Sequence, residues 1–388
     1  MKYLKLILKK SLGAIGYFLA KVFPKNNRII FFEDNQGNFN SNTKHLYLFF
    51  SKNKKFFKSY WLTSNKNVYN FLKNQKLGVI YTQSLKIFFL APRAKYLFGI
   101  GVKPTNYLNL FSGPCIKVNL WHGFGPRTTN RPPKLNKKFI NKIMSRKNII
   151  DSINTWDYFF VPSDFAKIRI AKKEYKLPNY KIKVFGSPRC DLMFKSNKNF
   201  TKLDQIDFSK KIILYAPTWR TELKDNFKIL ELIKNFKDFS IFLKKNNYVF
   251  LFNLHPMYND NVHFDLPDNI RFINPNPFFD INEILPKVSI LISDYSSVVT
   301  DYLLIKKKVI FFLHDYNKYY KKIGLIDDFK KALPGREINN YIELKKAIKN
   351  KKFVNKKITK NIKLHLKKYY DVKYKNSSKK IFNFINNI

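Results

Sequence analysis

Two histidines stand directly after apolar runs that have the composition of buried strands. His122 follows residues 118–121 and precedes a glycine-rich turn, in NLWHGFGPR. His255 follows the run YVFLFNL and precedes a proline. A neutral imidazole at such a place can take the proton of an attacking hydroxyl, and a protonated one can pair with a phosphate. A histidine of the core with satisfied ring nitrogens is the alternative for each.

The segment ISDYSSVVTDY combines the end of an apolar run with the start of a helical pattern. Ser296 or Ser297 is a natural N-cap, and the N–H groups of the first helical turn form a site for a phosphate. Asp294 precedes this turn, and Asp301 lies one turn further along, within reach of ribose hydroxyls. A simple helix cap without a ligand is the alternative.

Two further segments place arginines after strand-like runs. In LYAPTWR, Thr218 and Arg220 project from the turn, and a guanidinium suits bidentate recognition of phosphate. The alternative is a surface arginine that covers Trp219. In FGSPRCDLM, Arg189 and Asp191 follow another short apolar run.

Short apolar runs alternate with longer amphipathic segments along the whole chain. Strands are expected at 28–33, 59–63, 79–81, 96–100, 118–121, 158–162, 183–185, 211–216, 248–254, 271–273, 288–293 and 309–313. This alternation predicts parallel sheets built from βαβ units, in which ligands bind beyond the carboxyl ends of the strands. The polar stretch 195–209 is interpreted as an interdomain connection. We therefore expect an N-terminal helix at 1–24, a Rossmann-like acceptor domain at 25–200 and a Rossmann-like donor domain at 205–388.

The large excess of basic over acidic residues indicates a negatively charged partner. The 388 residues include 74 Lys and Arg against 26 Asp and Glu, a formal net charge of +48. Nucleic acid, an anionic membrane and a phosphate-rich polymer are all compatible with this charge, and a lysine-rich solvated surface is the alternative. No nucleic-acid-binding signature is present, and the aromatic residues lie mainly in the strand-like runs, so we expect no nucleic-acid partner.

Several kinds of site are excluded by their missing motifs. The sequence contains no G-x-G-x-x-G, Walker A, H-E-x-x-H, C-x-x-C or G-x-S-x-G pattern. Its two cysteines, Cys115 and Cys190, have no metal-ligand spacing and fit a reducing compartment. We therefore expect no metal and no cofactor.

The N-terminal segment has the pattern of a basic amphipathic helix. In MKYLKLILKKSLGAIGYFLAKVF, apolar residues recur at helical spacing while lysines interrupt every apolar stretch. No run of about 18–20 uncharged residues exists that would cross a bilayer. The helix either lies on an anionic membrane or packs on the core of the protein. Membrane binding would make the protein peripheral, at the cytoplasmic face of the cell membrane.

Taken together and in order, the segments resemble the CDP-glycerol glycerophosphotransferase family, the primases and polymerases of teichoic-acid-type polymers. The resemblance is carried by FFEDNQGNFNSNTKHLY, NLWHGFGPR, FVPSDFAK, FGSPRCDLM, ILYAPTWR, NLHP, LISDYSSVVTDYLLIKKKVIFFLHDYNKY and GLIDDF, over residues 31–329. It implies an α/β fold of GT-B type, with two Rossmann-like domains whose parallel sheets face across a cleft.

The resemblance also implies roles for the residues. His122 is similar to the family's proposed base, and His255 to the histidine expected at the donor phosphates. The residues expected to bind the donor are Thr218, Arg220, Asp294, Ser296, Ser297 and Asp301. Those expected at the acceptor or between the domains are Gly123, Arg127, Arg189 and Asp191. The family usually has T-P-L-K after W-H-G, whereas this chain has residues 124–127 as FGPR, so the acceptor is left open.

The implied reaction moves glycerol phosphate, or a related polyol phosphate, from CDP-glycerol or CDP-ribitol to an acceptor hydroxyl and releases CMP. The acceptor would be polyprenyl-diphosphate-linked or a polymer. The alternative is a nucleotide-sugar glycosyltransferase of the same fold, which would release UDP or GDP from a sugar donor.

Overall fold

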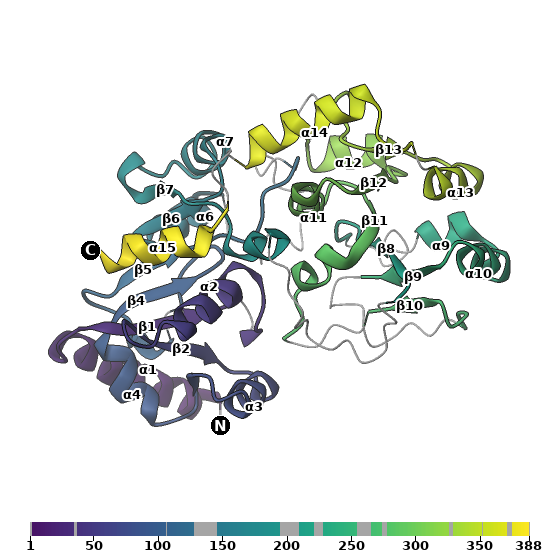
Figure 1. The fold of residues 1–388 in the computed structure, drawn as a ribbon. Coiled ribbons are helices and arrows are strands. Elements are labelled where there is room, and N and C mark those ends of the chain that lie inside the picture. Colours follow the sequence, from purple (N-terminus) through teal and green to yellow (C-terminus); the bar gives the residue numbers. More distant parts are fainter. Residues whose placement is uncertain are drawn as a thin grey trace. The chain divides into compact units, whose positions relative to one another are not determined.

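The computed structural model describes most of the chain and divides it into two compact units (Figure 1). The described residues are 2–34, 37–105, 107–127, 146–194, 209–220, 228–253, 265–273, 278–325, 329–350, 352–370 and 375–387. Unit 1 comprises Met1–His122, Lys138–Asp191 and Lys373–Ile388, and unit 2 comprises Gly123–Lys137 and Leu192–Val372. Each unit is built around its own parallel sheet.

Unit 1 contains a seven-stranded sheet in the order β3-β2-β1-β4-β5-β6-β7, with every neighbouring pair parallel. The strands are β1 (Asn26–Glu33), β2 (Lys58–Thr63), β3 (Val79–Tyr81), β4 (Ala94–Gly99), β5 (Ile116–Asn119), β6 (Tyr158–Val161) and β7 (Ile182–Val184). The chain runs outward from β1 to β3, returns to the other side of β1 and continues to β7. The order therefore reverses between β1 and β4, the position where open α/β sheets bind ligands.

Aromatic side chains build the core of unit 1. Phe32 of β1 is fully buried and stacks on Phe98 of β4, with ring centroids 5.1 Å apart. The helices of this unit are α2 (Ser41–Lys52), α3 (Lys66–Asn74), α4 (Lys86–Leu90), α6 (Arg146–Asn154), α7 (Asp164–Ala166) and α15 (Ser377–Asn386), with α1 described below. Both faces of the central strands are buried, which explains their nearly continuous apolar sequences.

Unit 2 contains a six-stranded sheet in the order β10-β9-β8-β11-β12-β13, again with parallel neighbours. The strands are β8 (Lys211–Tyr215), β9 (Tyr248–Phe252), β10 (Ile270–Phe272), β11 (Val288–Ser293), β12 (Lys308–Phe311) and β13 (Arg336–Glu337). The helices are α9 (Lys228–Ile233), α10 (Phe236–Lys245), α11 (Ser297–Tyr302), α12 (Tyr316–Lys322), α13 (Tyr341–Lys349) and α14 (Lys356–Tyr369). The order reverses between β8 and β11, so the turns after these two strands lie next to each other.

The predicted fold class is confirmed, and the chain division differs from the predicted bounds in two places. Both sheets are parallel and alternate with helices, as the apolar runs indicated. The segment after His122 groups with unit 2, and the C-terminal helix α15 groups with unit 1. Most of the polar stretch 195–209 lies outside the described residues. The local sequence does not predict that these two segments pack on the other unit, because each packing depends on contacts with residues far away in the chain.

The expected N-terminal helix is present as α1 (Lys2–Val22) and packs on its own unit. Asn109 Nδ2 donates a hydrogen bond to the carbonyl oxygen of Gly13 at 3.1 Å, and Ala20 is fully buried. Phe18 on the same helix is 64% exposed. One face of α1 therefore lies on the protein while other side chains face solvent. No helix among the described residues is both long enough and apolar enough to span a bilayer.

The docking of α1 depends on the absence of a side chain at Gly16. A Cβ atom at this position would overlap the backbone carbonyl oxygen of Leu108, whereas a Cβ atom at Gly13 would lie 3.4 Å from Asn109 Nδ2, an ordinary contact. We expect Gly16→Ala to destabilise unit 1 by about 1–3 kcal/mol through overpacking. Gly13→Ala is the matched control, and its higher helix propensity should stabilise by up to about 1 kcal/mol. Denaturant unfolding checks both values, and equal effects of the two substitutions would contradict this packing.

Candidate active site

His122 is the last residue of unit 1 before the chain passes to unit 2. It lies three residues beyond the end of β5, and its side chain is exposed. The centroid of the imidazole ring lies 4.3 Å from that of the Trp121 ring, and the angle between the two ring planes is 37°. This position leaves the ring accessible to a hydroxyl, as the role of a base requires.

Arg189 and Asp191 both lie in unit 1 and have defined partners there. The Arg189 guanidinium donates to the carbonyl oxygen of His122. The Asp191 carboxylate accepts hydrogen bonds from the backbone N–H groups of Ser377 at 2.8 Å and Ser378 at 2.9 Å, in the first turn of α15. A carboxylate is favourable at the N-terminus of a helix. Both side chains were expected at the acceptor or between the domains, and the structure gives them partners within unit 1.

In unit 2, the turns after β8 and β11 are joined by the carboxylate of Asp294. Asp294 Oδ1 accepts from the backbone N–H of Thr218 at 2.8 Å and from its hydroxyl at 2.7 Å. Asp294 Oδ2 pairs with Arg220 Nη2 at 2.7 Å. The side chains expected at two separate strand ends are therefore in contact, because β8 and β11 are neighbours at the reversal of strand order.

The guanidinium of Arg220 is shared with a second carboxylate, that of Asp315. Its Nε lies 3.0 Å from Asp315 Oδ2 and its Nη2 lies 3.1 Å from Asp315 Oδ1. The guanidinium also lies over the rings of Tyr295 and Tyr319, at 5.6 and 5.0 Å from their centroids. Arg220 is only 6% exposed, so it is an interior cation held by two acids.

Groups of the protein itself hold the guanidinium of Arg220 in place. Two carboxylates surround one guanidinium, and its donors are directed at Asp294, Asp315 and the carbonyl oxygen of Thr218. A bidentate contact with phosphate would require the guanidinium to give up these partners. Arg220 therefore joins the turns after β8, β11 and β12, and its expected contact with the donor stays a prediction. Asp315 was missed, although the segment LHDY after the expected strand 309–313 contains it.

The ion pair between Arg220 and Asp315 favours the charged form of both groups. Burial by itself would raise the pKa of Asp315, but the hydrogen bonds and the charge of Arg220 outweigh burial and lower it. Burial would lower the pKa of Arg220, and the two carboxylates, Asp294 first, raise it instead. Burial raises the pKa of the neighbouring Tyr319 to about 12.

The predicted cap at the start of α11 is confirmed, and Asp301, on the same helix, lies in the interior. Ser296 is the N-cap residue, and its hydroxyl accepts from the N–H of Val298 at 3.4 Å. Asp301 is 1% exposed and accepts from Asn282 Nδ2 at 3.0 Å and from the hydroxyl of Tyr370. An interior carboxylate with these partners joins α11 to its surroundings, and the expected contact of Asp301 with ribose stays a prediction.

The segment after His122 was expected on the acceptor side, and in the structure it groups with unit 2. A Cβ atom at Gly125 would lie 3.2 Å from Ser297 Cα and 3.3 Å from Ser297 N, so a side chain here would fit only if the backbone of Ser297 shifted by a few tenths of an ångström. Arg127 forms an antiparallel bridge with Leu325, and its side chain is exposed. Gly123, the first residue of the segment, also belongs to unit 2. His255 lies outside the described residues.

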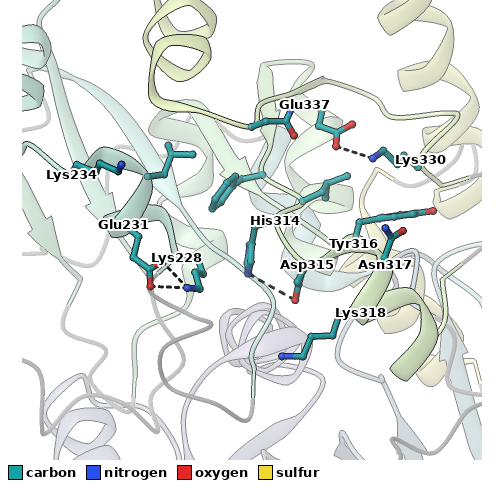
Figure 2. Close-up of a pocket in the computed structure, with 14 residues that line it drawn as sticks. Lys228, Glu231, Lys234, His314, Asp315, Tyr316, Asn317, Lys318, Lys330 and Glu337 are labelled. Atoms are coloured by element: carbon teal, nitrogen blue, oxygen red, sulfur yellow. Dashed lines mark hydrogen bonds and ion pairs between the residues drawn. The ribbon is translucent and has the colours of Figure 1, made fainter.

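A cavity of about 890 Å³ opens beside this cluster, within unit 2 (Figure 2). His314 and Asp315 lie in its wall, with His314 Nε2 3.9 Å from Asp315 Oδ2. Lysines and acids alternate around it, including the pairs Lys228–Glu231 and Lys330–Glu337. The sequence analysis did not single out this cavity, because its wall combines α9 with the turns after β12 and β13.

A second carboxyl group with a shifted pKa lies in unit 1, at the end of β1. Burial raises the pKa of Glu33 to about 7, and the N–H of Thr105, which donates to its Oε1 at 2.8 Å, partly opposes this. Glu33 lies at the reversal of strand order between β1 and β4. Glu33 belongs to the segment FFEDNQGNFNSNTKHLY, to which the sequence analysis assigned no site residue.

The Arg220 cluster leads to a prediction about stability. Asp315→Asn keeps the shape of the side chain but leaves a buried guanidinium with one acid, and we expect a loss of about 3–5 kcal/mol. Glu231→Gln is the matched control, because Glu231 is 60% exposed in its pair with Lys228 and should cost less than about 1 kcal/mol. Denaturant unfolding of both variants checks the difference.

The same variant tests the pH dependence. A carboxyl whose pKa is lowered by folding stabilises the protein fully above its unfolded pKa of about 3.9, and this stability is lost as the pH falls through the lower folded pKa. Asp315→Asn should therefore flatten the loss of stability below about pH 4. An acid-unfolding curve as steep as that of the wild type would show that Asp315 is not the group responsible.

The sequence is similar to a known family of enzymes, the family that the sequence motifs resemble. Residues 15–387 match the family described as CDP-Glycerol:Poly(glycerophosphate) glycerophosphotransferase. The chain is 25% identical over 378 residues to the teichoic acid ribitol-phosphate polymerase TarL of Staphylococcus aureus, covering 93% of this chain and 63% of that protein. It is 26% identical over 406 residues to the teichoic acid poly(glycerol phosphate) polymerase of Bacillus spizizenii, covering 98% of this chain and 97% of that protein.

A solved structure has the same fold. The wall teichoic acid polymerase TagF matches 100% of this chain and 95% of its own chain, with a TM-score of 0.79 and 21% identity. This similarity confirms the expected GT-B-type architecture. Because the family match extends over nearly the whole chain, the protein belongs to the CDP-glycerol:poly(glycerophosphate) glycerophosphotransferases, a family of transferase enzymes.

Proposed function

We propose that this enzyme transfers glycerol phosphate, or ribitol phosphate, from the CDP-activated donor to a hydroxyl group of a lipid-linked or polymeric acceptor, with release of CMP. The observation that carries the proposal is the family match over residues 15–387, which contains both His122 and the residues at the reversal of strand order in unit 2. Sequence identities of 25–26% to a ribitol-phosphate and a glycerol-phosphate polymerase leave both polyols in the proposal.

In the proposed reaction, His122 takes the proton of the acceptor hydroxyl. The hydroxyl oxygen forms a bond to the β-phosphorus of the donor, and the bond from that phosphorus to the oxygen bridging the two phosphates breaks. CMP leaves with the bridging oxygen. Positioning and electrostatic stabilisation carry most of the catalysis in phosphoryl transfer, so a single base and fixed donor contacts are sufficient.

Donor binding is proposed for the turns after β8 and β11. Ser296 and Ser297 offer hydroxyl and N–H groups at the start of α11, where negative charge is favoured. Thr218 and Arg220 are held beside them by Asp294. Arg127 supplies an exposed cation on the segment that approaches Ser297, and among the described residues its guanidinium has no ion pair. We therefore move Arg127 from the acceptor side to the donor side of the proposal.

The donor is tested directly by incubating the protein with CDP-glycerol and CDP-ribitol, in parallel with UDP- and GDP-sugars, and analysing products by mass spectrometry. Release of CMP with transfer of a polyol phosphate is expected. Release of UDP or GDP with transfer of a sugar would identify a nucleotide-sugar glycosyltransferase and refute the proposal.

Replacing the proposed base should stop turnover without unfolding the protein. We expect His122→Gln to lower the rate of CMP release by a factor of about 10² to 10⁴. Because the side chain is exposed and the donor residues lie in unit 2, the unfolding curve and the calorimetric binding of CDP-glycerol should be those of the wild type. Turnover close to normal would remove His122 from the mechanism.

A peripheral position on the anionic cytoplasmic face of the membrane is also proposed. Several apolar side chains on α1 and at α4 are exposed: Ile15, Phe18 and Val22 on α1, Leu85 at the N-cap of α4, and Phe89 in its last turn. The two helices are connected through the turn after α4, where the Arg93 guanidinium lies 3.9 Å from the centroid of the Phe23 ring. The lysines of α1 supply the positive charge that an anionic lipid surface attracts.

This surface can be tested with vesicles. The double variant Phe18→Ser with Phe89→Ser should weaken sedimentation with phosphatidylglycerol-containing vesicles at least about tenfold, since each buried Phe contributes about 1.5–3 kcal/mol. The control is Ile241→Ser, which removes a residue that is 67% exposed on α10 of unit 2. Equal vesicle binding by the double variant and the wild type would refute this membrane surface.

A further inference from the structure

The backbone around His122 leaves the sheet and needs other hydrogen-bond partners. The last ladder bond of this region runs from the N–H of Leu120 to the carbonyl oxygen of Gly99, at 2.9 Å. Leu120 and Trp121 are buried, with 3% and 6% of their surface exposed. Buried backbone N–H and C=O groups are almost always paired, so the polar groups of residues 120–122 require donors and acceptors from elsewhere.

Three buried side chains supply these partners. Asn119 Oδ1 accepts from the N–H of Trp121 at 2.7 Å, while Asn119 Nδ2 donates to the carbonyl oxygen of Gly101 at 2.7 Å. Asn42 Nδ2, from the first turn of α2, donates to the carbonyl oxygens of Leu120 at 3.1 Å and Trp121 at 3.0 Å.

The third side chain is connected to the second. Arg189 donates from its guanidinium to the carbonyl oxygen of His122, and its backbone N–H donates to Asn42 Oδ1 at 3.3 Å. Asn42 therefore contacts both the turn before His122 and the segment that contains Arg189. All these residues belong to unit 1, and Asn42 is 2% exposed.

The turn that these side chains hold has an unusual backbone. Trp121 has a φ angle of +49°, in the left-handed region that a bulky residue seldom adopts. Such a conformation persists only where its surroundings enforce it, and it is typical of functional sites. The Trp121 ring is also fixed, with centroids 5.5 Å from Phe159 and 5.3 Å from Tyr175.

We propose that Asn42 and Arg189 are positioning residues for His122: they hold residues 120–122 in the strained turn that directs the imidazole. This inference rests on the proposed function, since it assigns His122 the role of base. A catalytic group displaced by about 1 Å can lose roughly 10²-fold in rate, so such a clamp has a kinetic consequence beyond stability.

The C-terminal helix supports both parts of the clamp. Asp191, two residues beyond Arg189, accepts from the N–H groups of Ser377 and Ser378 at the start of α15. Phe382 of the same helix packs on Phe50 of α2, with centroids 5.0 Å apart. The last residues of the chain therefore stabilise the helix that carries Asn42 and the segment that carries Arg189.

The test compares Asn42→Ala with Asn53→Ala, a control at the C-cap of the same helix. Asn53 Nδ2 donates to the carbonyl oxygen of Phe49 and touches none of residues 120–122. We expect Asn42→Ala to lower kcat for CMP release roughly 10- to 100-fold, with KM for CDP-glycerol within about threefold of wild type, because the donor residues lie in unit 2. Asn53→Ala should leave both constants unchanged.

Arg189 provides an independent variant if Asn42→Ala does not fold. Arg189→Ala should show the same fall in kcat at constant KM, and Arg189→Lys, which keeps a cationic donor, should recover part of it. A folded Asn42→Ala or Arg189→Ala protein with normal kcat would overturn the proposal. A variant in which only the KM for CDP-glycerol rises would overturn it as well.

A readout without turnover separates this proposal from the proposed function. The rate at which diethyl pyrocarbonate modifies His122, followed by mass spectrometry, should change at least about threefold in Asn42→Ala and not in Asn53→Ala, as expected for a repositioned ring. If the wild type releases no CMP from either donor, the proposed function fails while this reactivity still tests the clamp. Identical reactivity in Asn42→Ala and the wild type would refute the clamp.

Discussion

Beyond the last ladder bond of a parallel strand, buried backbone groups have no partner within the sheet, and both units of this protein meet this requirement with polar side chains. In unit 1, Asn42, Asn119 and Arg189 bind the backbone after β5. In unit 2, Asp294 binds the backbone N–H of Thr218 after β8. The requirement explains why polar residues concentrate where the apolar runs end, and why so many of them are buried.

The same requirement accounts for the contacts of two buried arginines, Arg189 and Arg220. Arg189 and Arg220 follow strands and resemble phosphate-binding residues in the sequence, yet each directs its guanidinium to protein groups. Arg220 is held by Asp294 and Asp315, and Arg189 by the carbonyl oxygen of His122. A guanidinium with five donors in a fixed plane is well suited to join several turns. These two arginines are therefore explained by their partners within the protein and not by the high net charge of the chain.

The two exchanges of chain between the units have a shared consequence. The segment after His122 belongs to unit 2, so the residue proposed as the base lies at the first exchange. Helix α15 returns to unit 1 at the second exchange, and there it binds Asp191, next to the Arg189 part of the clamp. Gly125 lies on the first exchanged segment and packs closely on the backbone of Ser297.

The sequence by itself determined the fold class. Apolar runs such as 288–293 became buried parallel strands, since continuous burial on both faces leaves a local signal in composition. It also located His122, Asp294 and the N-cap Ser296, because strand ends and caps are local features. Tertiary structure alone decided that Arg220 has Asp315 as a partner, 95 positions away, and that Asp301 faces the interior. It also decided that Arg127 lies in unit 2 and that Asn42 holds the turn at Trp121, 79 positions away. These pairings depend on which strand ends become neighbours, and that is set by the order of strands in the folded sheet rather than by any spacing along the chain.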